Sequence, residues 1–299
     1  MSRTATSKPI IVGVDFSKDN AAAVEYAAAI AARRHLPLEL IYAWDPHSAP
    51  PGGRAMTVRE VTDEANSKLA AQVSALRQDI PGVAITTRFV TRSPTRALVK
   101  ASQRAGMLVL GSRGEGGFSQ LLLGSVTWRA VARAVCPVVV VRPDDHGADL
   151  AAGSVLVGID GSRTSRQALA FALDEASSRR TGLIAVNVWA VAHPEGLEVG
   201  RDWPVDDVTW RAQMESDANR ILSEALAGTG EQYPDVAVTA KAVHGFNVSQ
   251  TLLEVAASSR AGLVVVGARG RHAFGQLLLG AVGVQMAFHA DRPLAVVHS

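Results

Sequence analysis

Three glycines and a serine follow an apolar run in the first half of the chain, and their spacing is typical of a loop that binds an anion. The run Met107–Leu110 leads directly into Gly111-x-x-Gly114, and nine residues later come Gly124 and Ser125. A strand that ends in a glycine loop and then enters a helix presents backbone N–H groups to an anion. Glycine permits a close approach, because a Cβ atom would collide with a phosphate. The pattern therefore predicts a phosphate-binding loop.

The same pattern returns in the second half of the chain, where it lacks the serine. It reads Gly267-x-x-Gly270, nine residues, then Gly280 and Ala281. Ala281 has no hydroxyl with which to bond a phosphate or cap a helix. One such hydrogen bond contributes about 0.5–1.5 kcal/mol, and up to about 3 kcal/mol to a charged group. We therefore predict that the second loop binds its ligand more weakly, by roughly three- to a hundredfold, without losing it.

Two kinds of side chain beside these loops have both a binding and a plain structural interpretation. Ser125 stands where the last helix of its copy begins, so its hydroxyl either bonds a phosphate at the helix N-terminus or simply caps that helix. Arg113 and Arg269 occupy the same place in the two loops, and they either offset phosphate charge or lie solvated on the surface. The fixed glycine spacing around Ser125 favours the ligand interpretation.

An aspartate follows the first apolar strand of each copy, as Asp15 and as Asp160. In parallel sheets, ligands bind outside the carboxyl ends of the strands, where the strand order reverses. Asp15 and the Gly111 loop are therefore predicted to face one crevice. Gly13 would let a flat ring approach, and Asp15 would accept hydrogen bonds from an adenine amino group or a ribose hydroxyl. The alternative is that Asp15 only caps the turn between strand and helix.

These matches belong to a long internal repeat. Asp15 and Asp160 are 145 positions apart (160 − 15), whereas the glycine loops are 156 apart (267 − 111), so the second copy carries about eleven extra residues. We expect them mainly in residues 191–210, which include Trp203 and Trp210, and around residues 244–248. A period this long indicates two duplicated domains. The polar stretch from Arg142 to Gly153 predicts a linker. The predicted domains are residues 1–142 and 154–299, with residues 143–153 as the linker.

The elements that must position these residues alternate between strands and helices. In the first copy we expect strands at 10–14, 38–44, 84–90, 107–110 and 137–141, and helices at 19–35, 58–78, 95–105 and 126–134. Ser17 is a candidate N-cap for the first of these helices. Such alternation, with nearly all-apolar strands, is typical of parallel βαβ units. The predicted fold class is α/β, with two tandem doubly wound domains, each a five-stranded mainly parallel sheet with helices on both faces.

Composition restricts the classes of function. The hydrophobic content is 47% and the formal net charge only +2, without a run of Lys or Arg that would suggest nucleic-acid or membrane binding. Cys136 is the one cysteine, and its apolar neighbours predict a buried structural thiol in a reducing compartment. The polar first nine residues and the lack of a long apolar stretch predict a cytoplasmic protein without a signal peptide.

The loop pattern, together with an earlier strand that ends in aspartate, resembles the universal stress protein family, in the tandem form of its ATP-binding branch. The resemblance covers about residues 9–141 and 154–298. It implies an adenine nucleotide alpha hydrolase-like fold, ATP with Mg²⁺ as the ligand, no metal ligands from protein side chains, and a role in stress. The implied site of the first copy is Gly13, Asp15, Ala43, Gly111, Ser112, Arg113, Gly114, Gly124, Ser125 and Val126. That of the second copy is Gly158, Asp160, Val188, Gly267, Ala268, Arg269, Gly270 and Gly280, with Ala281 as the departure from the pattern.

Other catalytic signatures do not occur in the sequence. It contains no Gly-Lys-Ser/Thr phosphate loop, no G-x-G-x-x-G fingerprint after the first strand, no H-E-x-x-H and no G-x-S-x-G. The leading hypothesis is therefore an ATP-binding regulatory switch without a catalytic residue. The alternatives are a slow ATPase or adenylate-transferring enzyme, and an interaction scaffold whose glycine loops are structural relics.

The last strands of the two copies, at residues 138–141 and 294–297, are strongly apolar, and edge strands of this kind need cover. We predict that they pair with each other as an internal pseudo-dimer, as in the family. A homo-oligomer and an unidentified regulatory protein partner are also expected. The role of Trp203 and Trp210 stays open among a lid, a partner surface and local packing.

Overall fold

The computed structural model describes residues 8–47, 57–114, 123–143, 153–190, 207–270 and 279–298. Contacts divide these residues into two units. Unit 1 contains the residues up to 143 together with Ala287–His298, and unit 2 contains the described residues between them. The end of the second sequence copy thus belongs to unit 1.

Unit 1 is a doubly wound sheet of the predicted α/β class. Its strands lie in the order β3-β2-β1-β4-β5-β10, and the first five run parallel. The strands are β1 (Ile10–Val14), β2 (Leu38–Trp44), β3 (Ile85–Thr91), β4 (Met107–Gly111), β5 (Val138–Val141) and β10 (Leu294–Val297). The helices are the short 3₁₀ helix η1 (Lys18–Asn20), α1 (Ala21–Arg34), α2 (Val58–Asp79), α3 (Pro94–Ser102) and α4 (Ser125–Arg133). The order reverses between β1 and β4, which is where such sheets bind ligands.

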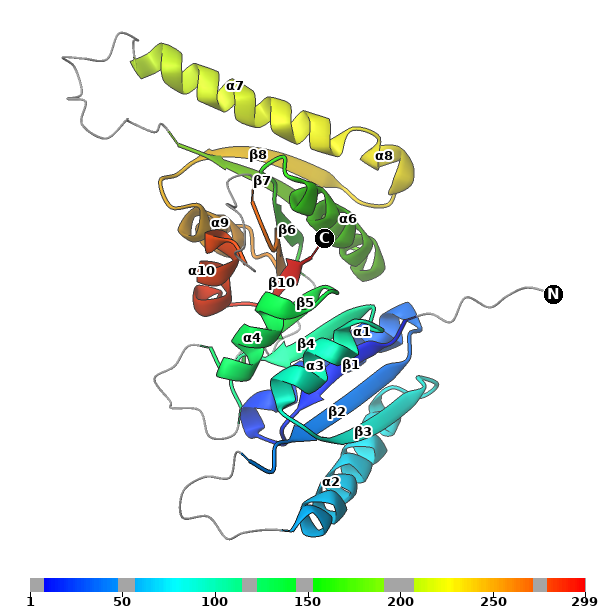
Figure 1. Ribbon diagram of the computed structural model, residues 1–299. Coiled ribbons are helices and arrows are strands. Elements are labelled where there is room, and N and C mark those ends of the chain that lie inside the picture. The colour runs from blue at the N-terminus through cyan, green and yellow to red at the C-terminus, as the bar shows by residue number, and fades with distance from the viewer. Residues whose placement is uncertain are drawn as a thin grey trace. The chain divides into compact units, whose positions relative to one another are not determined.

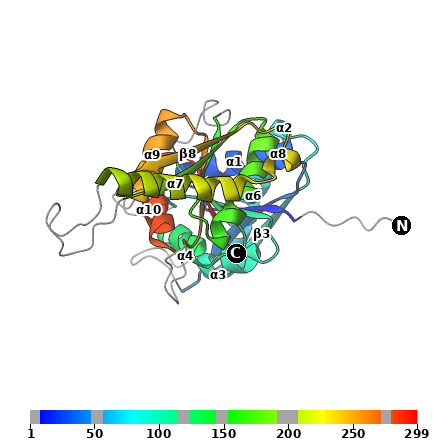
Figure 2. The same ribbon diagram turned by 90° about the horizontal axis from the view of Figure 1, so that it is seen from above.

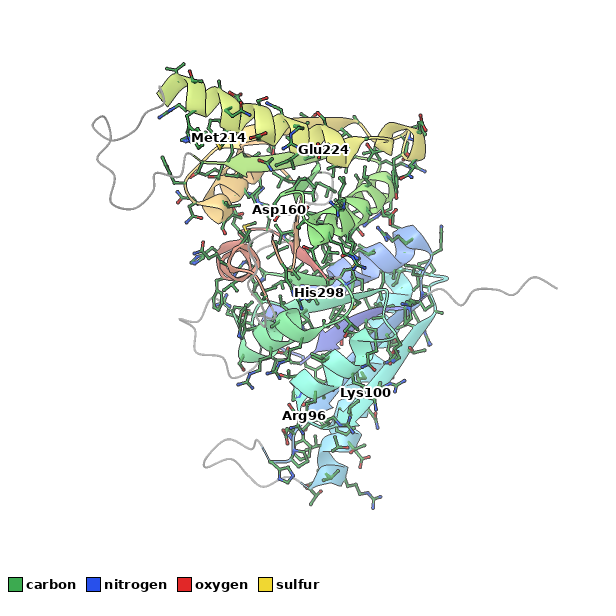
Figure 3. The ribbon with its side chains drawn as sticks, turned by 45° about the horizontal axis from the view of Figure 1, so that its top comes forward. Arg96, Lys100, Asp160, Met214, Glu224 and His298 are labelled. Atoms are coloured by element: carbon green, nitrogen blue, oxygen red, sulfur yellow. The ribbon has the colours of Figure 1, made fainter. Side chains whose placement is uncertain are left out.

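Local sequence explains where the unit 1 helices begin and end. The alanine-rich helix α1 buries its small residues against β1 and β4 and ends at His35, whose φ of 52° is the left-handed conformation common at helix C-termini. Helix α2 begins with a capping box, in which Thr57 and Glu60 bond each other's backbone N–H groups. Helix α3 packs against α4 on one side of the strands (Figure 1). Its exposed face carries Arg96 and Lys100 (Figure 3).

Unit 2 repeats this arrangement with the strand order β9-β6-β7-β8, all parallel. Its strands are β6 (Val155–Gly158), β7 (Leu183–Trp189), β8 (Val238–His244) and β9 (Leu263–Gly267). The helices are α6 (Arg163–Arg179), α7 (Asp207–Leu226), α8 (Thr229–Gln232), α9 (Val248–Ser258) and α10 (Ala281–His289), of which α10 ends among the unit 1 residues. Helix α7 lies along β7 and β8 in both views (Figures 1 and 2).

The two units also share their strand register. Leu38 pairs with Ile10 in unit 1, and Leu183 pairs with Val155 in unit 2, so both partners shift by the same 145 positions. Helix α6 ends at Arg180 with a φ of 55°, which matches the left-handed His35. The repeat read from the sequence is therefore a repeat of backbone geometry.

The predicted pairing of the last strands is confirmed, because β10 runs antiparallel to β5, with Ala295 opposite Val139. Arg142, the first residue of the polar stretch after β5, makes hydrogen bonds within unit 1. Its guanidinium donates to the carbonyl oxygens of Phe288 at 2.9 Å and Ala287 at 3.2 Å, and also to that of Ala290. A cation is favoured there because the last carbonyl groups of a helix carry partial negative charge.

Candidate nucleotide-binding site

A cavity of about 350 Å³ opens at the carboxyl ends of β1 and β4 in unit 1. This volume lies within the usual range for small-molecule sites. Chain segments far apart in sequence meet there, namely the ends of β1 and β2, one side of α3, the glycine loop and the first turn of α4. Nine of the ten predicted residues of the first copy line this cavity: Gly13, Asp15, Ala43, Gly111, Arg113, Gly114, Gly124, Ser125 and Val126.

The tenth predicted residue, Ser112, lies behind the cavity wall. It is fully buried, and its hydroxyl has no hydrogen-bond partner within the described part of the chain. Its backbone holds the loop, because its N–H donates to the carbonyl of Val141 at 2.8 Å and its carbonyl accepts from the N–H of Gly124 at 2.7 Å. Ser112 thus closes the glycine loop between β4 and α4 through its main chain.

Asp15 takes part both in a turn and in the cavity wall. Its Oδ1 accepts hydrogen bonds from the N–H of Ser17 at 2.9 Å and from its Oγ at 2.7 Å. Its Oδ2 faces the glycine loop, so closely that a Cβ atom built on Gly114 would collide with it. Ser17 occupies an N-cap position, as predicted, but it does not make the hydrogen bond of an N-cap. Ser17 precedes η1, but its side chain makes no cap bond because its hydroxyl donates to Asp15.

The interpretation of Ser125 as a helix cap is wrong, because Gly124 occupies the N-cap position of α4. Ser125 is the first helical residue, and its side chain is exposed at the cavity. The first N–H groups of a helix have no acceptor within the helix and carry partial positive charge. Arg113 adds a full charge at the same wall, with its Nε 3.8 Å from Oδ2 of Asp19. This end of the cavity suits an anion.

Sequence reasoning missed the two polar side chains that fix the strand ends. Asn20 and Thr127 both line the cavity, and both are buried. Nδ2 of Asn20 donates to the carbonyl of Gly13 at 3.0 Å, and Oγ1 of Thr127 donates to the carbonyl of Gly111 at 2.7 Å. Their one sequence signal is a polar side chain on the buried face at the start of a helix.

Part of the cavity lining is apolar and aromatic, and it too was missed. Leu98, Leu110 and Tyr42 contribute to this wall. The ring of Tyr42 lies 4.9 Å from that of Phe16 and 5.7 Å from that of Phe89, measured between centroids. Phe16 adopts a φ of 63°, a left-handed conformation that is costly for a bulky residue. A cavity lined both by apolar and aromatic side chains and by a helix N-terminus with an arginine suits an amphipathic anion.

Unit 2 keeps the loop geometry of the predicted second site. Oδ1 of Asp160 (Figure 3) accepts from the N–H of Ser162 at 2.9 Å. A Cβ atom on Gly270 would lie 2.9 Å from Oδ2 of Asp160, and the N–H of Gly280 donates to the carbonyl of Ala268 at 2.8 Å. The remaining predicted residues lie on the same elements. Gly158 and Gly267 end β6 and β9, Val188 lies in β7, Arg269 is exposed in the loop, and Ala281 begins α10.

The polar side chains differ between the units. Ser165, Ala281 and Gly283 stand where unit 1 has Asn20, Ser125 and Thr127. The left-handed position held by Phe16 in unit 1 is occupied in unit 2 by Gly161, with a φ of 80°. The described ends of the two loops therefore share the contact between aspartate and glycine and the hydrogen bond that returns to the loop start, but they differ in the side chains that support them.

The described ranges contain neither a cluster of metal-ligating side chains nor a helix that could span a membrane. No group of three or more His, Cys, Asp or Glu residues there is arranged to hold a metal ion. No helix among those residues combines the length and the apolar character required to span a bilayer.

Comparison with known proteins gives one family across the chain. A model described as the universal stress protein family matches residues 6–142 and again residues 152–298. A universal stress protein of Mycolicibacterium smegmatis is 38% identical over 304 residues, covering 99% of both chains. Universal stress protein Rv2623 of Mycobacterium tuberculosis is 36% identical over 310 residues, covering 99% of this chain and 98% of its own. The crystal structure of a universal stress protein from Archaeoglobus fulgidus matches the fold with a TM-score of 0.70 at 18% identity, covering 98% of each chain.

Proposed function

Because this chain belongs to the universal stress protein family, in its tandem two-domain form, we propose that it binds ATP in the cavity of unit 1 and acts as a regulatory switch. The observation that carries this proposal is the convergence of the glycine loop, the start of α4 and Asp15 on one cavity. The first two offer N–H groups to phosphates, and Asp15 offers a carboxylate to a sugar or base.

The character of the lining residues supports a placement for each part of the nucleotide. The triphosphate belongs beside Gly124, Ser125 and Arg113, where the helix N-terminus and the guanidinium supply positive potential. The adenine is placed against the apolar and aromatic part of the lining, next to Tyr42 and the backbone of Ala43. The ribose then lies by Asp15. The metal of Mg-ATP would be held by the phosphates, since the described residues offer no set of side-chain ligands for it.

The second site is proposed to bind ATP more weakly. It has the same glycine spacing and the same Asp160–Gly270 contact, but Ala281 offers no hydroxyl to a phosphate. A switch also requires that ATP bind two states of the protein with different affinity. We further propose that the protein acts in the cytoplasm, forms a homo-oligomer and binds a regulatory protein partner.

Calorimetric titration of the full-length, nucleotide-stripped protein with Mg-ATP tests this proposal. Two sites of unequal affinity are expected, and Ala281→Ser should strengthen the weaker one. A universal stress protein has been solved in complex with cAMP, so cAMP is titrated in parallel. A protein without saturable ATP binding would leave the scaffold alternative. A turnover assay on the wild-type protein separates binding from hydrolysis, and a rate that vanishes in Gly124 or Ser125 variants would favour the enzyme alternative.

A further inference from the structure

We propose that Asn20 and Thr127 are positioning residues that hold the phosphate-binding backbone of unit 1 and thereby set its affinity for the anionic part of a nucleotide. This inference rests on the proposed function and extends it to residues outside the glycine pattern. Each side chain is buried, lines the cavity and donates a hydrogen bond to the carbonyl at the end of a strand.

Thr127 joins the two structural parts of the anion site. It lies in the first turn of α4, and its Oγ1 donates at 2.7 Å to the carbonyl of Gly111, the last residue of β4. Gly111 is also the first glycine of the loop. The hydroxyl therefore fixes the start of the loop relative to the helix N-terminus, so that their N–H groups converge on one anion.

Asn20 occupies the point where the strand order reverses. Its Nδ2 donates at 3.0 Å to the carbonyl of Gly13 in β1, and a Cβ atom on Gly111 would lie 3.4 Å from the same nitrogen. The side chain thus lies between the ends of β1 and β4 and keeps both strand ends at a set distance from the cavity.

Both hydrogen bonds have an electrostatic consequence. A carbonyl oxygen carries partial negative charge, and one left without a donor beside the cavity would repel a phosphate. Donation from Asn20 and Thr127 offsets that charge at Gly13 and Gly111. The effect requires an anionic ligand, so it distinguishes ATP from its uncharged nucleoside.

Unit 2 provides a natural contrast. Ser165 replaces Asn20, and its Oγ donates to the carbonyl of Ser162 at 3.0 Å, within its own helix turn. Gly283 replaces Thr127 and has no side chain. Neither of the two hydrogen bonds therefore has an equivalent at these positions of unit 2. The loop there is held by Thr164, whose Oγ1 donates to the carbonyl of Arg269.

The test compares ATP with adenosine on full-length, nucleotide-stripped protein. Thr127→Val keeps the shape but removes the donor, and we expect about a three- to tenfold loss of ATP affinity at the tighter site. Adenosine affinity should stay within about twofold, because adenosine carries no phosphate. Thr127→Ser restores the donor and should restore ATP affinity. Thr62→Val is the matched control, since the Thr62 hydroxyl donates to the carbonyl of Val58 in a solvent-exposed hydrogen bond within α2.

Asn20→Ser gives a second, independent variant, because it installs the residue found in unit 2. It should also weaken ATP more than adenosine. Equal ATP affinity in wild type, Thr127→Val and Asn20→Ser would overturn the positioning role, as would equal losses for ATP and adenosine. A wild-type protein that binds no ATP at all would instead overturn the proposed function, and the positioning role with it.

Discussion

The contact between a carboxylate and a glycine is the residue-scale feature that the two units share most closely. Oδ1 of Asp15 is held by Ser17, so Oδ2 has little freedom to leave Gly114. Asp160 and Gly270 repeat the contact. A glycine is therefore required at this position because a Cβ atom would collide with the carboxylate. It is not required for its backbone conformation, because Gly114 is not among the residues with positive φ.

Gly114→Ala is accordingly expected to displace the loop and weaken ATP binding at the tighter site by roughly tenfold or more, because overpacking costs about 1–3 kcal/mol. Calorimetric titration of the variant measures this loss. Gly230→Ala is the matched control, since a Cβ atom at Gly230 meets nothing within 4 Å. Unchanged binding in Gly114→Ala would show that the loop tolerates a side chain there and would remove the steric argument.

Cys136 gives a second residue-scale prediction. Burial raises the pKa of its thiol to about 12, and hydrogen bonds from the backbone offset only part of this rise. The thiolate is the reactive form, so the native protein should not react with a disulfide reagent near pH 8. It should react fully once unfolded in guanidinium chloride. Rapid reaction of the native protein would contradict the burial.

The residues that were predictable from sequence are those fixed by spacing. The glycines, Asp15 and Arg113 were predicted to face one crevice, and they line one cavity, because the backbone of a glycine loop at a strand end limits which residues fit. Asn20, Thr127 and Tyr42 could not be found, because what places them in the wall is the packing of separate segments. The capping role of Ser125 was wrong for a local reason, since Gly124 lies one residue earlier with the extended conformation of an N-cap.

At the scale of elements, one ion-pair cluster connects the edge strand β3 to the rest of unit 1. Glu39 in β2 accepts from Nε of Arg88 in β3 at 2.9 Å and from Nη2 of Arg104 at 2.7 Å. Burial alone would raise the pKa of the Glu39 carboxyl, but the hydrogen bonds and charges of Arg104 and Arg88 outweigh it and hold the pKa below 4.5. The carboxylate is thus stabilised in the folded state.

A carboxyl whose pKa falls on folding contributes stability above its ordinary pKa, and that contribution is lost as the pH drops through the folded pKa. Glu39→Gln should therefore lower the free energy of unfolding by about 1–3 kcal/mol at neutral pH and by less near pH 4, as measured by urea denaturation. Glu64→Gln, whose pair with Lys68 is half exposed, should change it by at most about 0.5 kcal/mol. An equal effect of Glu39→Gln at both pH values would exclude an ionic origin.

The order of elements was predictable because alternating apolar strands and helices have few packing solutions. The boundaries shifted by a few residues, as in α3, predicted at 95–105 and observed at Pro94–Ser102. The entry into α1 was less regular than predicted, because the turn after Asp15 places Phe16 at positive φ and opens with η1. Such turns depend on tertiary contacts, here the ring of Tyr42.

At the scale of the whole chain, the last residues of the second sequence copy belong to unit 1, where they pair with the last strand of the first copy. Arg142, just after β5, donates to carbonyl groups at the end of α10. His298 (Figure 3), just after β10, places Nε2 2.8 Å from the carbonyl oxygen of Val131 in α4 and Nδ1 3.1 Å from that of Cys136. Arg142 and His298 are 156 positions apart, like the two glycine loops. By its position in the sequence, residue 298 belongs to the second copy. The pairing of β10 with β5 places it in unit 1.

The contacts that join β5 and β10 predict that the two strands open together. Arg142→Ala removes hydrogen bonds from a charged donor, which contribute about 1.5–3 kcal/mol each. We expect amide hydrogen exchange in both strands to accelerate by about tenfold or more. Arg142→Lys keeps the charge but loses the planar fork, so its effect should be intermediate. Arg129→Ala, at an exposed position of α4, is the control. Fast exchange in β10 with unchanged exchange in β5 would contradict their mutual dependence, because β5 would then hold its place without its antiparallel partner.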